Sequence, residues 1–143
     1  MNKVRILCLH GWRSNRDILK FQLSTGMLPY LSTVNRLNLY EFVCINGINS
    51  TEKAADDTLE KINEHLGNKE AYQEWFDTQT ETVEKRGSGA GEGAELVYKY
   101  NGVDDSVKYV IKYIEEHGKF DCLLGFSVRY SLKKYVSKTK FRI

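Results

Sequence analysis

The stretch Phe120-Asp121-Cys122-Leu123-Leu124-Gly125-Phe126-Ser127 decides the fold of this 143-residue chain. Five of its first seven residues are apolar and the run stops at Gly-Phe-Ser, which predicts a short buried strand. A helix is predicted just before it, because apolar side chains recur at helical spacing over residues 103–114. Asp104 and Asp105 fall in the first turn of that helix, where acids are favoured, and Gly118 closes it.

Two more strands are predicted nearer the N-terminus. Residues 4–9 are almost continuously apolar, which suits a parallel strand covered on both faces. Residues 39–45 form a second strand that stops at the turn signal Asn46-Gly47. The helix between them can be capped by Ser14 or Asn15. A strand, a helix and a strand in this order imply a right-handed crossover and a parallel sheet, so the predicted fold class is α/β.

The middle of the chain is less regular. Residues 51–66 are charged with apolar residues at helical spacing, which predicts an exposed amphipathic helix. Tyr72, Trp75 and Phe76 form an aromatic cluster in an otherwise polar segment. The glycine-rich run 87–93 does not follow a strand and lacks the Lys-Ser/Thr of a phosphate-binding loop, so we predict a flexible connector.

The composition is that of an ordinary globular protein with a formal net charge of +2. No apolar run approaches the roughly 20 residues of a membrane span. The N-terminus shows no signal peptide, and we expect a cytoplasmic protein. Cys8, Cys44 and Cys122 each lie in an apolar strand-like run, and their spacing fits no zinc site. We therefore predict buried reduced thiols, no metal site and no cofactor.

The composition changes after Ser127. Residues 128–143 carry six basic residues and no acid, whereas residues 1–127 have a net charge of −4. We therefore divide the chain into a 1–127 domain and a basic, divergent 128–143 tail with the spacing of an amphipathic helix. A solvated helix is favoured over a membrane-binding or nucleic-acid-binding one. A shifted or read-through reading frame is a further hypothesis for this tail.

The exit of the 120–127 strand has the pattern of a nucleophile elbow. A serine on a tight turn between strand and helix exposes its hydroxyl above the sheet, and the following N–H groups point at a developing oxyanion. The order and spacing of three blocks resemble the family of serine hydrolases FSH, in the α/β-hydrolase superfamily. These blocks are Ile6-Leu7-Cys8-Leu9-His10-Gly11-Trp12, Glu74-Trp75-Phe76, and Gly102-Val103-Asp104-Asp105-Ser106 continuing through Gly118 to Ser127.

The resemblance implies a partial α/β-hydrolase fold of three layers, α/β/α, with a short parallel sheet in which the three strands take the order 2-1-3. It implies a carboxylic-ester hydrolase that acts on small acyl esters, with Ser127 as the nucleophile. The oxyanion hole would use the backbone N–H groups of Trp12 and Val128. His10, Gly11 and Gly125 would support these motifs.

Two departures from the family bear on activity. The family continues Ser-Gln-Gly, and that glycine lets the helix pass close to the strand. Here Arg129 stands in its place. The family's catalytic acid and histidine lie well downstream, and the 16 residues after Ser127 contain no Asp, Glu or His. We therefore expect a serine hydrolase truncated after its nucleophile that is weak or inactive alone.

None of the three histidines is a strong candidate for the missing base. His10 belongs to the His-Gly turn and is predicted to be structural. His117 ends the helix that leads into the last strand, at the wrong end of the sheet. His65 is predicted to lie on a solvated helix face, although triads are defined by geometry rather than by sequence order.

Two other functions stay open. One is a non-catalytic remnant that acts by protein association through an open sheet edge or the basic tail, since the last strand would have an unpaired apolar edge. The other is a flavodoxin-like nucleotide-binding module. It ranks lower because no glycine-rich phosphate turn follows the first strand.

Overall fold

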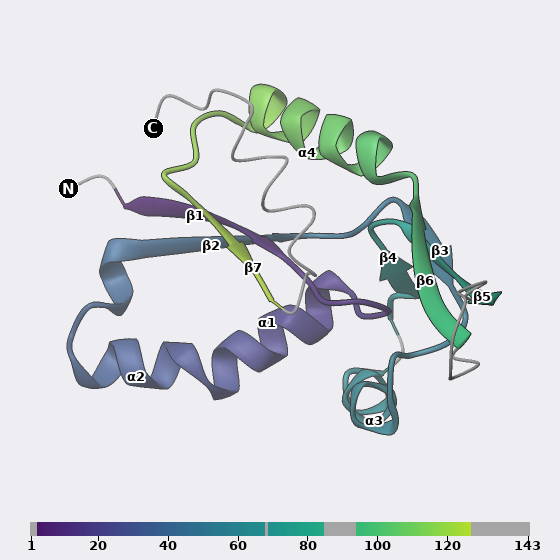
Figure 1. Ribbon diagram of the computed structural model, residues 1–143. Coiled ribbons are helices and arrows are strands. Elements are labelled where there is room, and N and C mark those ends of the chain that lie inside the picture. The colour runs from purple at the N-terminus through teal and green to yellow at the C-terminus, as the bar shows by residue number, and fades with distance from the viewer. Residues whose placement is uncertain (1–2, 68, 85–93, 127–143) are drawn as a thin grey trace.

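A computed structural model describes residues 3–67, 69–84 and 94–126 of the chain (Figure 1). Strands and helices alternate at its two ends, and the middle holds two antiparallel strand pairs and one helix. In chain order the elements are β1 Val4–Leu9, α1 Arg16–Thr25, α2 Met27–Thr33, the short 3-10 helix η1 Leu37–Leu39, β2 Tyr40–Ile45, β3 Asn49–Thr51, α3 Asp57–His65, β4 Tyr72–Glu74, β5 Asp77–Glu84, β6 Ala94–Asn101, α4 Val103–His117 and β7 Cys122–Gly125.

The central sheet has three parallel strands in the order β2-β1-β7. Strand β1 pairs with β2 along its whole length, from Val4 opposite Tyr40 to Leu9 opposite Ile45. On its other side β1 pairs with β7, where Leu9 lies opposite Gly125. The predicted fold class and the order 2-1-3 are therefore confirmed, with β7 as the third predicted strand.

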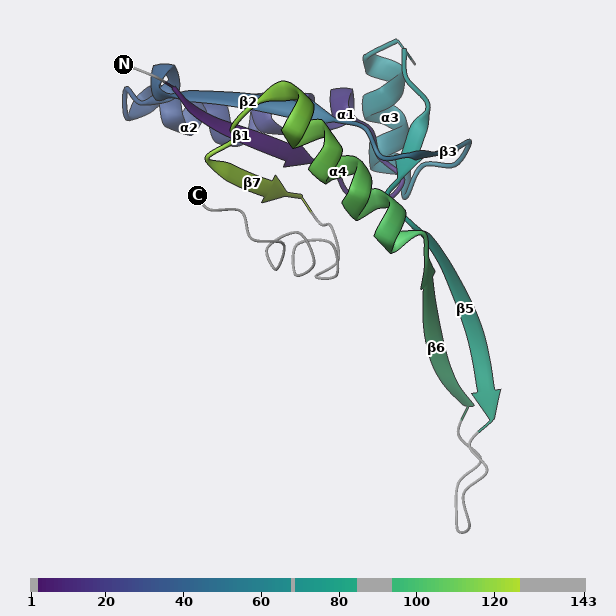
Figure 2. The same ribbon diagram turned by 90° about the horizontal axis from the view of Figure 1, so that it is seen from above.

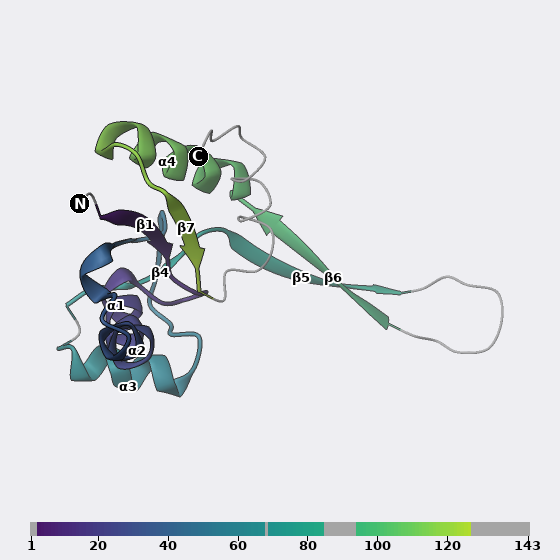
Figure 3. The same ribbon diagram turned by 90° about the vertical axis from the view of Figure 1, so that its left-hand side faces the viewer.

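Helices cover both faces of this sheet, which makes three layers (Figures 1 and 3). Successive side chains of β1 point to opposite faces, so Leu7 and Leu9 pack with Val110 of α4, whereas Cys8 packs with α1. The nearly continuous apolar character of β1 follows from this burial on both sides. The α1 side of the core contains Cys8, Leu19, Leu23 and Cys44.

The start of α1 and the end of α4 lie where the sequence indicates. The side chain of Asn15 caps α1 by accepting the backbone N–H groups of Asp17 and Ile18. Helix α4 ends at Gly118, whose φ of 87° is a backbone conformation that favours glycine.

The middle of the chain differs from the predicted exposed helix over 51–66. Helix α3 starts only at Asp57, because Asp56 caps it by accepting the N–H of Leu59. Thr51 instead ends β3, which pairs antiparallel with β4, and residues 52–56 form neither helix nor strand. Trp75 and Phe76 are buried in the core beneath α4, which explains aromatic residues in a polar segment.

Strands β5 and β6 form a hairpin that the sequence analysis did not predict. Their antiparallel ladder runs from Asp77 opposite Asn101 to Glu84 opposite Ala94, and the ribbon projects away from the body (Figure 2). Strand β5 reads DTQTETVE, and its threonines and charges hide the apolar alternation that signals a strand. The predicted connector 87–93 and the predicted tail 128–143 lie outside the described residues.

One prediction about the cysteines is wrong. Cys8 and Cys44 are buried, but Cys122 is exposed because it starts β7 at the end of the sheet, before the strand enters the core. In the described part of the chain, no helix is both long and apolar enough to span a membrane.

Candidate active site

The three parallel strands end along one border of the sheet, at Leu9, Ile45 and Gly125; we call this border the carboxyl edge. In open α/β sheets, ligands bind outside the carboxyl ends of the strands. After β7, Phe126 donates its backbone N–H to the carbonyl oxygen of Leu9 at 3.0 Å. Ser127 is the next residue and lies outside the described residues. The chain is thus held against the β1 exit up to the residue before this serine.

His10 is the first residue after β1 and is fully buried. Its Nε2 accepts the backbone N–H of Gly47 at 2.9 Å, so its proton must be on Nδ1, which lies 2.7 Å from the carbonyl oxygen of Gly11. Burial lowers the pKa of His10 to about 4, and the imidazole is neutral at physiological pH. Both ring nitrogens have partners, so His10 is a structural group rather than a free base.

Trp75 fixes the backbone of His10 as well. Its indole Nε1 donates to the carbonyl oxygen of His10 at 2.9 Å, and the two rings lie 5.1 Å apart. The carbonyl oxygen of Trp75 in turn accepts the hydroxyl of buried Ser106 in α4. The predicted sequence blocks around His10, Trp75 and Ser106 therefore meet in one buried cluster beside the carboxyl edge.

Beyond His10 the chain turns outward at Gly11 and Trp12. The side chain of Trp12 is 46% exposed, which is unusual for so large an apolar group next to the core. Arg13 follows with a φ of 47°, a left-handed conformation that is uncommon for a residue with a side chain. Strained backbone of this kind concentrates at functional sites and persists only where surrounding contacts hold it.

The contacts that hold this turn come from residues 46–76, which we call the 46–76 segment. The backbone of Arg13 accepts from the N–H of Ala55 at 3.3 Å, and that of Ser14 accepts from the N–H of Gln73 at 2.6 Å. The guanidinium Nε of Arg13 also lies 2.7 Å from the carboxylate of Glu74. None of these contacts uses the N–H of Trp12.

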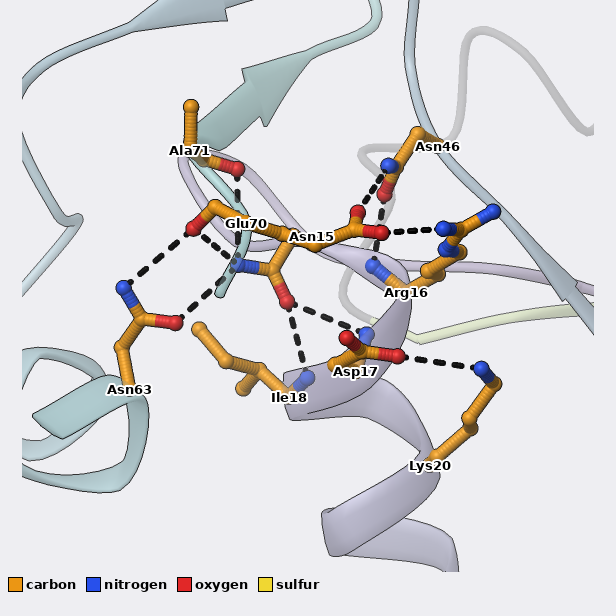
Figure 4. A network of polar contacts seen from close by, with 9 residues as sticks. All are labelled: Asn15, Arg16, Asp17, Ile18, Lys20, Asn46, Asn63, Glu70 and Ala71. Atoms are coloured by element: carbon orange, nitrogen blue, oxygen red, sulfur yellow. Dashed lines mark hydrogen bonds and ion pairs between the residues drawn. The ribbon is translucent and has the colours of Figure 1, made fainter. Parts of the chain in front are cut away.

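A polar network continues this anchoring to the start of α1 (Figure 4). The Nδ2 group of Asn15 donates to Asn63 and to the carbonyl oxygens of Glu70 and Ala71, at 3.3–3.4 Å. The carboxylate of Glu70 accepts from Asn46 and pairs with Arg16. The exits of β1 and β2 are thereby joined to the loop before β4.

The other two histidines lie where the sequence predicts. His65 is exposed on α3, with its ring edge-on to Phe21 of α1 at 5.8 Å. His117 ends α4, and its carbonyl oxygen accepts from Arg5, which lies at the opposite end of the sheet from the carboxyl edge. Among the described residues, no group of three His, Cys, Asp or Glu side chains could hold a metal ion.

The structure thus brings together four of the predicted site residues, His10, Gly11, Trp12 and Gly125, at the carboxyl edge. Ser127 and Val128 lie outside the described residues. The sequence analysis missed the contacts of the 46–76 segment with the turn. No spacing rule pairs Arg13 with Glu74, because the two are 61 positions apart.

The fold is a mixed α/β fold with a small parallel sheet between helices, and its third strand ends at the glycine of the sequence Gly-Phe-Ser. Residues 1–130 match the family described as serine hydrolase (FSH1), and the chain belongs to this family. It is also 34% identical over 125 residues to Esterase C25G4.2 of Caenorhabditis elegans. That alignment covers 87% of this chain and 46% of the esterase, so the chain spans about half the length of this relative. No solved structure matches the chain.

Proposed function

We propose that Ser127 is the nucleophile of a carboxylic-ester hydrolase. The observation that carries this proposal is the hydrogen bond from the N–H of Phe126 to Leu9, which holds the residue before the serine at the exit of β1. This bond places Phe126, the residue before the proposed nucleophile, beside the strand exit that continues into Gly11 and Trp12. Membership of a serine hydrolase family supports the same role.

The oxyanion hole of this proposal consists of the backbone N–H groups of Trp12 and Val128. Attack of a serine hydroxyl on an ester carbonyl places negative charge on the carbonyl oxygen, and two fixed N–H donors stabilise that charge. The N–H of Trp12 suits this role, because its neighbours in the turn are anchored while it makes none of those anchoring bonds.

The substrate in this proposal is a small acyl ester. The rings of Trp12 and Phe126 are each 46% exposed and offer apolar surface near the exits of β1 and β7. An acyl chain gains about 0.8 kcal/mol for each methylene group that such surface removes from water.

The serine must also be activated. A serine hydroxyl needs a base to take its proton. His10 has both nitrogens engaged, His117 is at the opposite end of the sheet, and His65 lies on α3 beside α1. We therefore expect these 143 residues alone to hydrolyse esters slowly and to be labelled slowly by serine-directed probes.

Labelling with a fluorophosphonate probe tests the nucleophile. The purified chain is incubated with the probe beside the Ser127→Ala variant, and circular dichroism confirms that both are folded. Labelling of the parent chain that is lost in the variant supports an activated serine. A folded parent chain that takes up no probe contradicts the proposal.

A second candidate function is association through the free edge of β7. Among the described residues β7 pairs only with β1, and its other edge presents backbone groups that can pair with another chain. Concentration-dependent sedimentation tests this candidate, with Leu123→Pro as the edge-disrupting variant, because the N–H of Leu123 faces away from β1 in this register. A chain that stays monomeric at all concentrations contradicts it.

A further inference from the structure

Arg13 is held in place from three directions. Its guanidinium carbon lies 4.4 Å from the centroid of the Trp12 ring, and its Nε lies 2.7 Å from Oε1 of Glu74. Its carbonyl oxygen accepts the N–H of Ala55 at 3.3 Å. One side chain thus contacts both the exposed Trp12 ring and a carboxylate of the 46–76 segment.

The pair of Arg13 with Glu74 differs from an ordinary surface ion pair. The Glu74 side chain is only 12% exposed, and that of Arg13 is 32% exposed, so water screens the pair less than a fully exposed one. By contrast, the pair of Lys99 with Glu81 on the hairpin is 54% and 49% exposed, although its distance is also 2.7 Å. Solvent-exposed pairs of that kind contribute little to stability.

The backbone of Arg13 gives the pair a specific task. A φ of 47° is costly for arginine, so contacts must hold the residue there. This φ sets the direction of the peptide between Trp12 and Arg13, and through it the direction of the turn that carries the Trp12 N–H. If the side chain of Arg13 were released, this backbone could relax to a commoner conformation.

We propose that Arg13, held by Glu74, is a positioning residue that fixes Trp12 at the carboxyl edge with its N–H directed toward the acyl oxygen. This deepens the proposed function and rests on it, because Trp12 is the oxyanion donor of that proposal. In this proposal the carboxylate of Glu74 acts through Arg13, and Arg13 acts through Trp12. The 46–76 segment is thereby coupled to the reacting centre.

The test measures the rate of fluorophosphonate labelling of Ser127 in the full chain, separated into the inactivation rate constant and the probe's dissociation constant. Glu74→Gln removes the charge at nearly constant size, and Glu81→Gln is the matched control on the hairpin. Arg13→Gly removes the side chain while allowing the positive φ, so it separates loss of the side chain from backbone strain. Arg13→Lys keeps the charge but loses the planar fork.

We expect Glu74→Gln and Arg13→Gly to lower the inactivation rate constant roughly tenfold to a hundredfold, because misdirecting one oxyanion donor has effects of this order. The probe's dissociation constant should change less than about twofold, and Arg13→Lys should recover part of the rate. Glu81→Gln should match the parent chain. A Glu74→Gln variant that labels at the parent rate overturns the positioning role and leaves Ser127 as nucleophile.

A second readout does not depend on activity. The chain contains two tryptophans, so incorporation of 5-fluorotryptophan gives two fluorine resonances, and Trp12→Phe identifies that of Trp12. We expect Glu74→Gln to shift or broaden the Trp12 resonance and Glu81→Gln to leave it unchanged. If the parent chain is not labelled at all, the proposed function fails. The Trp12 resonance of the Glu74→Gln variant then tests the positioning role separately. A shifted or broadened resonance supports that role, and an unchanged resonance refutes it.

Discussion

The imidazole of His10 and the backbone of Gly47 are joined by a hydrogen bond of 2.9 Å, in which the N–H of Gly47 donates to Nε2. The bond links the exit of β1 to the exit of β2. It requires a neutral imidazole, because a protonated Nε2 has no lone pair to accept with. The buried bond therefore makes the carboxyl edge of the sheet sensitive to acid.

Stability should fall as His10 is forced to take a proton. Its folded pKa of about 4 lies below the ordinary value of 6.5, so the unfolded chain binds more protons between these values. The contribution is fully present above pH 6.5 and is lost as the pH falls toward 4. We expect the free energy of unfolding in urea to drop by about 2 kcal/mol between pH 7 and pH 4.5 from this group alone.

The His10→Gln variant isolates that contribution, because glutamine does not titrate. It should be less stable than the parent chain at pH 7 and lose less stability on acidification. Equal acid sensitivity of the two proteins would show that other groups cause the loss.

Gly47 should not tolerate a side chain. A Cβ at this position would lie 2.6 Å from the backbone oxygen of Glu74, closer than such atoms approach in real proteins. We expect Gly47→Ala to lower the free energy of unfolding by about 1–3 kcal/mol, because the backbone of the 46–76 segment must move. Gly26→Ala is the comparison. Its Cβ would lie 3.2 Å from the backbone oxygen of Gln22, a less severe contact, so this variant should lose less stability. Equal melting temperatures of the two variants would argue against the close approach.

Loss of the two helix caps should have unequal effects. Asn15 is buried and accepts two N–H groups of α1 while it donates to the 46–76 segment. Asp56 is exposed and accepts only one N–H of α3. We expect Asn15→Ala to cost about 2–3 kcal/mol of unfolding free energy and Asp56→Ala about 1 kcal/mol. Urea denaturation of both variants measures the difference, and a larger loss for Asp56→Ala would contradict it.

The thiols should react in two classes. Cys8 lies opposite Cys44 in adjacent strands, and its pKa is raised by a hydrogen bond with the Cys44 thiol and by burial, so its reactive thiolate is scarce. Cys122 is exposed. We expect a disulfide reagent to titrate one thiol in the native chain and three in denaturant. The Cys122→Ser variant should show none in the native state, and rapid reaction of two or more native thiols in the parent chain would contradict this arrangement.

The parallel sheet could be predicted because its signals are local and strong. Apolar runs such as Val4–Leu9, the cap at Asn15 and the positive φ at Gly118 each follow from a few neighbouring residues. The hairpin escaped prediction because β5 is rich in threonine and charge. Cys122 was predicted to be buried from its neighbours, but burial depends on how far the strand extends into the core.

The candidate site could be predicted only where local motifs mark its residues. The His-Gly and Gly-Phe-Ser motifs mark the strand exits, so they identify His10 and Gly125 directly. The partners of the turn come from the 46–76 segment, in which no motif marks them as its partners. Contacts such as that between Arg13 and Glu74 depend on the path of the whole segment, which no local pattern encodes.

The β5–β6 hairpin leaves and rejoins the body at neighbouring points, since Asp77 lies directly opposite Asn101. Adjacent ends of this kind allow the chain between them to be lengthened, shortened or exchanged while the flanking Phe76 and α4 keep their places. The hairpin is therefore a natural position for an inserted tag, a fluorescent reporter or a compact two-residue turn. Variation in length among proteins with this fold can be accommodated there without disturbing the sheet.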